Sequence, residues 1–423
     1  MSPIPVAVLG YGNSARTFHI PFIGALPDAF YVAVVLQRAR RAGSSAPVAA
    51  ADLPGVQVAA DIGAALAALP EGEGLVVITT DNASHFPYAK QALEHGKHVL
   101  VEKPVAVDEK DVVSLELLAR SKGLVCTAYQ NRRFDGDLLT LQTLLRDTAP
   151  SVPSALGVPT YFESRFDRFR PMAKGGWREE VDPETQGGGT LWDLGAHLVD
   201  QAVSIFGPPE SVFGLMRNQR GQGSEHVDDD WLAVLSYPRM NPLPGDAHAP
   251  GTRPQGLRVV LGSTCLSTHT DAEQPRFRVE GTHGSYVKTG TDPQESQLKR
   301  GWLPGTHGDA FGAYEDTDPA AVRFGRLTTS QRSDEPATPA NPPKLAACDI
   351  PTLPGRYLNL YINLYDTIRA AEDARARGAS VDQVNTVIDG ALLVRLDQAA
   401  TTTRVLRLIR QSAEEGRVLP WTL

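Results

Sequence analysis

The sequence has few cysteines, no cluster of basic residues and no long apolar stretch, and each absence excludes a class of protein. The three cysteines, Cys126, Cys265 and Cys348, lie far apart, so they predict neither a disulfide framework nor a CxxC pair. Free thiols are typical of a reducing compartment, and we expect a cytoplasmic protein. The net charge of -8, without a basic stripe, argues against a nucleic-acid partner.

The apolar runs of the chain are short. None approaches the roughly 18 residues that a membrane helix needs. The N-terminus enters a strand-like run at Pro5 and lacks the basic start and the longer apolar stretch of a signal peptide. We therefore expect no membrane partner.

The first third of the chain alternates short apolar runs with helical patterns. The runs that are apolar on both faces, as buried parallel strands are, are residues 6–9, 32–36, 56–59, 75–79, 99–102 and 124–128. Between them, residues 84–94 and 109–121 have a periodicity of about 3.6 residues. Strands that alternate with helices predict a doubly wound, parallel sheet.

After about residue 131 the pattern changes to alternating polar and apolar residues. These stretches are residues 161–169, 212–216, 231–237, 257–266 and 277–288, with helices expected at 134–145 and 191–206. Strands joined by turns predict a mostly antiparallel sheet, so we divide the chain into an α/β nucleotide-binding domain, 1–131, and an α+β domain, 132–423. Residues 290–355 are rich in Gly, Pro, Thr and Asp and predict a loop-rich insertion. Two helical patterns close the chain, at 357–377 and from 381 to about 408.

A glycine-rich turn follows the first predicted strand and opens a helix. It has a GxGxxA pattern, in which Gly10 allows the tight turn, Gly12 lets a pyrophosphate approach the backbone and Ala15 permits close helix packing. The free N–H groups at the start of the helix favour phosphate. The pattern predicts a dinucleotide site made by Gly10, Gly12, Asn13, Ser14 and Ala15. A tight turn in an α/β protein without a cofactor is the alternative.

The end of the second predicted strand carries arginines where an acid is usual. An NAD-binding domain has Asp or Glu here for the ribose 2′-hydroxyl, whereas this chain has Arg38, Arg40 and Arg41. A guanidinium suits a 2′-phosphate through paired hydrogen bonds. The sequence therefore favours NADP, bound through Arg38, over NAD. Arginines of a solvated loop are the alternative.

A Glu-Lys-Pro segment, 102–104, ends the fifth predicted strand, at the edge where open α/β sheets bind ligands. On its own, the segment fits a surface lysine at the end of a strand as well as it fits a ligand-binding lysine. Its surroundings, TDNASH (80–85) and GKHVLVEKP (96–104), with GGGTLWDLGAH (187–197) and EGTHGS (280–285), closely resemble the Gfo/Idh/MocA oxidoreductases. That family is named after glucose–fructose oxidoreductase and inositol dehydrogenase. The resemblance covers nearly the whole chain except 290–355 and implies a Rossmann domain followed by an α+β domain built on an open, mostly antiparallel sheet.

Three further motifs resemble one branch of this family. They are YQNRRFD (129–135), FDRFRP (166–171) and WRE (177–179). The branch includes bacterial scyllo-inositol dehydrogenases and many uncharacterised fungal members. One position departs from the family, which usually has proline before Asn82, where this chain has Asp81. The loop beside the nicotinamide can therefore differ in shape.

The resemblance also implies a cofactor site and a catalytic triplet. The cofactor residues that it adds to the glycine-rich turn are Thr80, Asn82, His85, Glu102 and Lys103. The catalytic residues are Lys103, Asp193 and His197, of which Asp193 and His197 share one face of a predicted helix. His197 can remove the alcohol proton, Lys103 can stabilise negative charge on the reacting oxygen, and Asp193 can bind a neighbouring hydroxyl.

Each member of the triplet also has a plainer interpretation. His197 alone fits a buried structural histidine, and Asp193 alone fits an intrahelical ion pair. Their spacing suits a metal as well, but no third ligand stands nearby in the sequence, so we expect no metal.

Three arginines and one aspartate are weaker candidates for a substrate pocket. They are Arg132, Arg133, Asp167 and Arg168. A hydroxyl-rich substrate needs several hydrogen-bonding groups, but the same residues could hold the two domains together.

The resulting hypothesis is an NADP-dependent oxidoreductase, with NAD possible, that transfers a hydride between the nicotinamide and a hydroxyl or carbonyl carbon of a sugar, inositol or other polyol. The alternative from another class is a sugar or dinucleotide sensor without catalysis, because the family includes regulators such as the yeast galactose repressor. The triplet favours chemistry, since a sensor does not need it; a non-sugar carbonyl substrate is a third alternative. The family pattern implies a homodimer or homotetramer through the open face of the C-terminal sheet.

Overall fold

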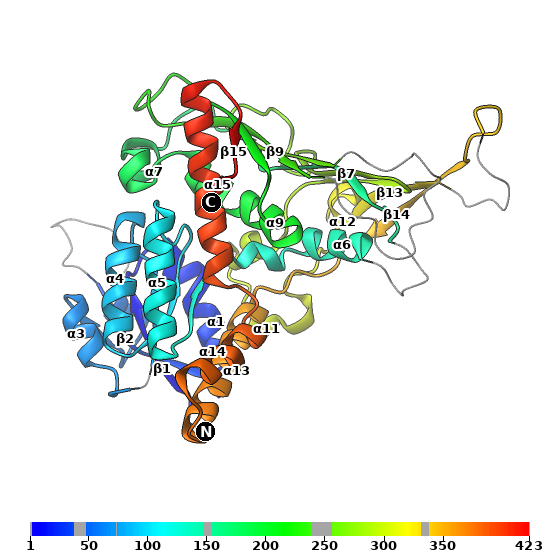
Figure 1. Cartoon of the computed structure of the whole chain (residues 1–423). Helices are drawn as coiled ribbons and strands as arrows, with labels where there is room; N and C mark the ends of the chain where they lie inside the picture. The colour runs from blue at the N-terminus through cyan, green and yellow to red at the C-terminus, as the bar shows by residue number, and fades with distance from the viewer. Residues whose placement is uncertain are drawn as a thin grey trace.

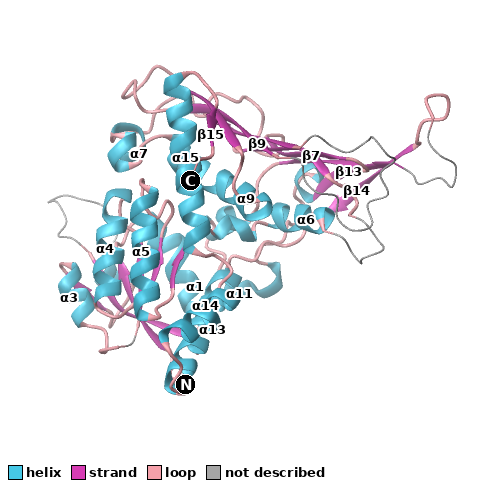
Figure 2. Ribbon diagram, viewed as in Figure 1, coloured by secondary structure: helices cyan, strands magenta, loops and turns pink. Residues whose placement is uncertain are grey.

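Two sheets lie one above the other and are joined by a long helix near the C-terminus (Figure 1). The structure is a computed structural model that describes residues 2–37, 48–72, 74–146, 154–238, 256–330 and 338–422. In Figure 2 the smaller sheet lies between helices, whereas the larger sheet has helices on one side. None of the helices in these ranges is both long and apolar enough to cross a membrane. All three cysteines are free thiols.

The N-terminal sheet is parallel, and its strands coincide with the predicted apolar runs. The strands are β1 (Ile4–Leu9), β2 (Phe30–Leu36), β3 (Gln57–Ala59), β4 (Leu75–Ile78), β5 (His98–Val101) and β6 (Cys126–Ala128). Their order is β3-β2-β1-β4-β5-β6, so the direction of winding reverses between β1 and β4, as in a Rossmann fold. Every residue of β1, β4 and β5 is buried, which is why these strands have no polar face. The predicted doubly wound domain is confirmed.

Helices cover both faces of this sheet. They are η1 (Ala15–His19), α1 (Ile20–Gly24), α2 (Ala49–Asp52), α3 (Ile62–Ala67), α4 (Asn82–Glu94) and α5 (Glu109–Lys122). Local sequence sets the ends of α5: the Asp108 carboxylate accepts a hydrogen bond from the Lys110 N–H, and Gly123 stops the helix at φ 63°.

The second sheet is mixed and mostly antiparallel, as predicted. Its strands are β7 (Pro159–Arg165), β8 (Ser211–Arg217), β9 (Asp230–Tyr237), β10 (Leu257–Thr264), β11 (Pro275–Gly281), β12 (Gly284–Thr289), β13 (Phe324–Ser330), β14 (Leu345–Pro351) and β15 (Leu419–Pro420). Their order is β14-β13-β12-β11-β7-β10-β9-β8-β15, and β7 and β10 are its parallel pair. The stretch predicted at 277–288 is two strands, β11 and β12, joined by a turn. Alternate residues of β9 are buried against the helices, as the period of two requires.

The helices of the second domain come mainly from the middle of the chain. They are η2 (Asn131–Phe134), α6 (Gly136–Leu145), α7 (Trp177–Glu180), α8 (Pro183–Gln186), η3 (Leu191–Gly195) and α9 (Ala196–Phe206). The helix predicted at 191–206 begins with a π-helical turn, η3, and continues as α9.

The stretch expected to be a loop-rich insertion, 290–355, contains regular elements in its described part. They are α10 (Gln294–Lys299), α11 (Pro304–His307), η4 (Gly308–Ala310), α12 (Ala320–Arg323), β13 and β14. Strand β13 pairs with β12 and extends the sheet, and β14 forms its exposed outer edge. Periodicity does not reveal these elements, because the helices are short and β14 has no buried face.

The C-terminal helices differ from the prediction at one point. They are α13 (Leu358–Ala376), α14 (Val381–Ala391) and α15 (Leu396–Glu415), so the single helix expected from 381 to about 408 is wrong. Asn363 causes the break: its Nδ2 donates to the Ala391 carbonyl at 2.8 Å, and its Oδ1 accepts from the Leu393 N–H at 2.9 Å. Thr127 also donates to the Val394 carbonyl at 2.6 Å. These tertiary hydrogen bonds satisfy backbone groups that a continuous helix would use internally.

Helices α13 and α14 pack on the first domain, and α15 connects the two sheets. Buried residues of α13, such as Tyr361 and Ile368, belong to the core of the N-terminal sheet, although they follow residue 131 by more than 200 positions. Helix α15 packs on α5 of the first domain and on β8 and α9 of the second. In Figure 1 it runs in red from one layer to the other. The relative position of the two sheets is therefore set by the end of the chain.

Candidate active site

A cleft of about 740 Å³ opens between the two sheets, at the carboxyl ends of β1, β2, β4 and β5. The predicted site residues that line it are Gly10, Gly12, Asn13, Ser14, Thr80, Asn82, His85, Glu102, Lys103, Arg168, Asp193 and His197. Of the remaining candidates, Ala15 is buried behind the turn, and Arg38 lies outside the described residues. The cleft spans the point at which the strand order reverses, where α/β sheets bind their ligands.

The glycine-rich turn has room for a ligand. Gly10 has φ +105°, and a Cβ there would lie 3.0 Å from Thr79 Oγ1, so both the conformation and the space require glycine. A Cβ on Gly12 would meet no described atom within 4 Å, so its backbone faces open space in the cleft. These features fit the pyrophosphate of a dinucleotide.

The end of β2 offers a neutral amide to the cleft. Gln37 lines it, and its Oε1 accepts a hydrogen bond from the Ala49 N–H at 2.9 Å. Since Arg38 to Arg41 lie outside the described residues, the structure does not test the predicted contact of Arg38 with a 2′-phosphate.

Glu102 is a buried anion beneath the glycine-rich turn. Its carboxylate accepts from Ser14 Oγ and from the Lys103 N–H, and it lies 3.1 Å from His19 Nε2. Burial raises the pKa of Glu102, but the hydrogen bond from His19, the charges of His19 and Lys103, and the Ser14 hydroxyl outweigh burial and lower this pKa to about 2. Glu102 therefore ties the turn to the end of β5. His19 also contacts the Tyr361 hydroxyl at 2.7 Å, which extends this link to α13.

Lys103, Asp193 and His197 meet in the cleft as predicted from the sequence. The Lys103 Nζ donates to the Asp193 carbonyl oxygen at 2.6 Å and to its Oδ1 at 3.1 Å. Arg178 Nε lies 3.1 Å from the same Oδ1. Burial raises the pKa of Asp193, but the positive charges of Lys103, Arg178 and Arg168 outweigh burial and hold it well below its usual range. Asp193 is therefore a carboxylate throughout the neutral range.

His197 is buried at the base of the cleft. Burial, with the charges of Lys103 and Arg132, lowers its pKa well below the usual value, although Asp193 opposes this effect. Its Nδ1 is buried and has no hydrogen-bond partner among the described residues. The imidazole is therefore neutral at pH 7 and can accept a proton.

The residues at the end of β4 fix the loop beside Lys103. His85 Nδ1 contacts the Pro104 carbonyl at 2.7 Å, and Asn82 Nδ2 donates to the Gly187 carbonyl of the second domain at 3.1 Å. Asp81, which departs from the family pattern, precedes α4 and accepts a hydrogen bond from Ser84 Oγ at 3.0 Å. Ser84 Oγ also lies 2.8 Å from Thr80 Oγ1. The loop is thus held by side chains without the family's proline.

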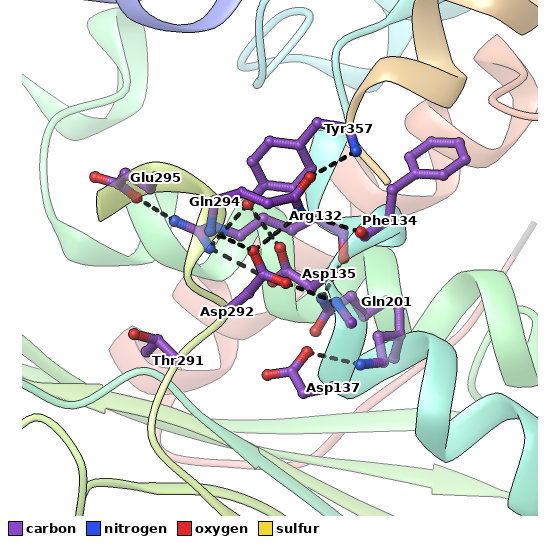
Figure 3. Close-up of polar contacts among 12 residues, drawn as sticks. Arg132, Phe134, Asp135, Asp137, Gln201, Thr291, Asp292, Gln294, Glu295 and Tyr357 are labelled. Atoms are coloured by element: carbon purple, nitrogen blue, oxygen red, sulfur yellow. Dashed lines mark hydrogen bonds and ion pairs between the residues drawn. The ribbon is translucent and has the colours of Figure 1, made fainter. Parts of the chain in front are cut away.

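Arg132 lies at the edge of the cleft within a buried polar network (Figure 3). Its Nη2 lies 2.5 Å from Glu295 Oε2, and its Nη1 lies 3.4 Å from both Asp135 Oδ2 and the Tyr357 hydroxyl. Burial raises the pKa of Glu295, but Arg132 and Lys299 outweigh burial and lower it to about 2. Glu295 and Lys299 come from α10, so the supposed insertion supplies part of the cleft wall.

Two weaker substrate candidates are placed elsewhere. The Arg133 guanidinium makes two 2.7 Å hydrogen bonds to Asp200 and one of 2.7 Å to Gln398. Asp167 accepts from Arg165 Nε at 2.6 Å. Neither Arg133 nor Asp167 lines the cleft. Arg133 joins η2 to Asp200 and Gln398, and Asp167 also accepts from the Thr264 N–H at 3.0 Å, so these contacts lie within the second domain and do not bridge the two domains.

Sequence reasoning also missed several residues of the cleft. They are Tyr11, Phe18, Gln37, Arg170, Lys174, Trp192, Arg220, Asp228, Cys265, Glu295 and Lys299. Most stand alone in loops or strands, so no spacing pattern marks them. Tyr11, Trp192 and Arg170 are exceptions, because they belong to the glycine-rich turn, the GGGTLWDLGAH segment and the FDRFRP segment already noted.

The fold and the cleft define a two-domain oxidoreductase with a dinucleotide-binding Rossmann domain. Residues 4–130 match the oxidoreductase family with an NAD-binding Rossmann fold, and residues 154–287 match the GFO/IDH/MocA C-terminal domain. The chain belongs to the Gfo/Idh/MocA family and is an enzyme of the dehydrogenase type. The family resemblance predicted from the sequence is confirmed.

Relatives match over almost the whole chain. An uncharacterised oxidoreductase of Schizosaccharomyces pombe is 36% identical over 368 residues, 87% of this chain and 90% of that protein. The scyllo-inositol 2-dehydrogenase (NADP(+)) IolW of Bacillus subtilis is 28% identical over 416 residues, 98% of this chain and 95% of that enzyme. A solved Yersinia pestis structure, described as an oxidoreductase, is 33% identical with a TM-score of 0.72, covering 100% of this chain and 98% of that one.

Substitution of Glu102 tests its role as a buried anion. Because its pKa in the folded protein is about 2, below the ordinary 4.5, its ionised form stabilises the fold above pH 4.5, and this contribution is lost as the pH falls towards 2. Glu102→Gln should lower the free energy of unfolding by roughly 3 kcal/mol at pH 7. Denaturant unfolding between pH 7 and 3 should show this difference shrinking.

The exposed Glu94, paired with Lys90 on α4, provides the control. Glu94→Gln should change stability little at any of these pH values. An equal loss in both variants, or a Glu102→Gln deficit that does not depend on pH, would contradict the assignment.

Proposed function

We propose that this enzyme transfers a hydride between NADP and a hydroxyl or carbonyl carbon of a sugar, inositol or other polyol. The observation that carries the proposal is the convergence of Lys103, Asp193 and His197 in the cleft that also contains the glycine-rich turn. The NADP-dependent scyllo-inositol dehydrogenase relative supports both the cofactor and the substrate class. The bound nicotinamide supplies the redox chemistry, and the residues of the chain supply position and proton transfer.

Each residue of the triplet has a role that follows from its contacts. An ammonium has three donors, and Lys103 uses two on Asp193, so the third can donate to the reacting oxygen and stabilise negative charge there. His197 is neutral and accepts the alcohol proton during oxidation. Since its Nδ1 is buried, Nε2 is the nitrogen that meets the substrate. Asp193 holds Lys103 in position through these two hydrogen bonds.

A sensor without catalysis is the second candidate. The cleft would also suit binding alone, but a sensor gains nothing from a neutral histidine held beside a lysine–aspartate pair. These contacts favour catalysis.

We predict tighter binding of NADPH than of NADH, by at least about tenfold. No acidic residue stands at the end of β2 to repel a 2′-phosphate: Gln37 is neutral there, and Arg38 follows it in the sequence. Titration with each nucleotide, followed by quenching of tryptophan fluorescence, measures the two affinities, and Arg38→Ala should reduce the difference. Tighter binding of NADH would overturn the NADP assignment and leave the enzyme class intact. Binding of neither nucleotide would favour another ligand for the glycine-rich turn.

We predict that Lys103→Met and His197→Ala each lower kcat/KM for polyol oxidation by about 10² to 10⁴-fold, as expected for loss of a proton-transfer or charge-stabilising group. Nucleotide affinity should change by less than about threefold. Steady-state kinetics and the titration above measure the two effects separately. Lys90→Met, on the exposed face of α4, is the matched control and should leave both unchanged. Full activity in Lys103→Met or His197→Ala would sink the mechanism.

We also propose a homodimer or homotetramer formed through the second sheet. Among the described elements, α6, α9 and α15 lie on one face of this sheet, and the other face carries no helix (Figure 2). Leu215 and Val287 are 53% and 46% exposed, which suits an interface. Light scattering of the purified protein should give two or four chains, and Leu215→Lys should shift the mass towards one. A monomeric wild type would refute the proposal.

A further inference from the structure

The part of the cleft wall that the second domain supplies has more basic than acidic side chains. The basic ones are Arg132, Arg168, Arg170, Lys174, Arg178, Arg220 and Lys299, and the acidic ones are Glu179, Asp193, Asp228 and Glu295. An excess of positive charge in a cleft attracts anions and raises their local concentration.

Most of these basic side chains are already neutralised by an acid. Asp193 pairs with Lys103 and Arg178, and Glu295 pairs with Arg132 and Lys299. Arg220 is held by Glu179 and Asp229, both within 2.9 Å. Arg168, Arg170 and Lys174 make no ion pair with any residue that the structure describes. The three are close in sequence and lie on the loop after β7.

Arg170 and Lys174 are exposed, whereas Arg168 is half-buried. Its backbone is fixed, since its N–H donates to the Thr264 carbonyl at 3.0 Å and its carbonyl accepts from the Ser267 N–H at 3.2 Å. The guanidinium lies 5.1 Å from the centroid of the buried Phe166 ring. Backbone and side chain are thus held in place before any ligand binds.

The surroundings of Arg168 do not balance its charge. Burial and the charges of Arg170 and Arg132 lower its pKa, while Asp193 and Glu295 oppose this effect from a distance. Both of these acids already hold two other cations. Arg132 makes the contrast clear: it shares the Phe166 ring, 4.8 Å from the centroid, but has its own partners in Glu295 and Asp135 (Figure 3). A half-buried cation without a partner costs stability unless a ligand supplies the opposite charge.

We propose that the substrate carries an anionic group, a carboxylate or a phosphate, and that Arg168 binds it. The inference rests on the proposed function and narrows its substrate class to sugar acids or sugar phosphates. A guanidinium pairs with either group through two parallel hydrogen bonds. Arg168 lies within electrostatic range of Asp193. The anionic group bound by Arg168 and the carbon that faces Lys103 and His197 would therefore belong to one substrate molecule. The exposed Arg170 and Lys174 would steer it into the cleft.

The test compares matched pairs of substrates with the full-length enzyme and its preferred nucleotide. The pairs are gluconate with glucitol, glucuronate with glucose, and glucose 6-phosphate with glucose. At least one anionic member should have a kcat/KM about 30-fold or more above that of its neutral partner. The pair that shows this preference distinguishes a carboxylate from a phosphate.

Three variants assign the preference to Arg168. Arg168→Met should lower kcat/KM for the anion by about 30 to 1000-fold and change that for the neutral partner less than threefold. Arg168→Lys should restore part of the loss, because it keeps the charge but not the paired geometry. Arg377→Met, on the exposed end of α13, should change neither.

Binding separates this inference from the proposed function. Calorimetry of the enzyme–NADPH complex should show the anion binding to wild type and at least 30-fold more weakly to Arg168→Met, even if no member of a pair turns over. Equal use of anionic and neutral substrates, equal losses for both in Arg168→Met, or no anion binding would overturn the inference. The inference would also be overturned if Arg168→Met bound NADPH more weakly and the substrate as tightly as wild type, since Arg168 would then bind the nucleotide.

Discussion

The contact of Lys103 with Asp193 is the interaction on which the site depends. It joins the end of β5 in one domain to η3 in the other, across 90 residues of sequence, through the Asp193 carbonyl and carboxylate. Because both groups are largely buried, loss of Asp193 would leave the Lys103 ammonium without its counter-charge. Arg178 adds a second cation to the same carboxylate. The pair therefore forms part of the domain interface as well as of the proposed catalytic site, and a change in the docking of the two sheets would separate its two groups.

That docking rests on residues remote from the cleft. Helix α15 packs against elements of both domains, and Arg133 links η2 to Asp200 on α9 and to Gln398 on α15. At the cleft itself, Asn82 Nδ2 donates to the Gly187 carbonyl. Such contacts fix the relative positions of the side chains that line the cleft, as the proposed catalysis requires. The charges within the cleft also depend on this arrangement. Burial, with the nearby cations, lowers the pKa of His197 and keeps it neutral, and the acids are shared among other cations, so that Arg168 has no ion-pair partner among the described residues.

The sequence predicted the N-terminal sheet well because buried parallel strands are continuous apolar runs, and each of them became a strand. It failed where tertiary contacts override a local pattern. The helical periodicity runs on past Ala391, but Asn363 on α13 takes the backbone hydrogen bonds at that point and starts a new helix. Residues 290–355 have little periodicity, yet α10 places Glu295 against Arg132. Nothing in the local sequence around Glu295 indicates that contact.

By itself, the sequence determined the Rossmann topology and the glycine-rich turn, because these depend on local spacing and apolar runs, and its motifs determined the family. The resemblance to that family, and not local spacing, selected Lys103, Asp193 and His197 among the residues that line the cleft. Only the tertiary structure decided which charged residues have partners. It assigned Arg133 and Asp167 to the framework and Arg168 to the cleft, although all three are polar residues of similar motifs. The physical reason is that neutralisation of a charge depends on distances between side chains from different elements, and those distances exist only once the two sheets have docked.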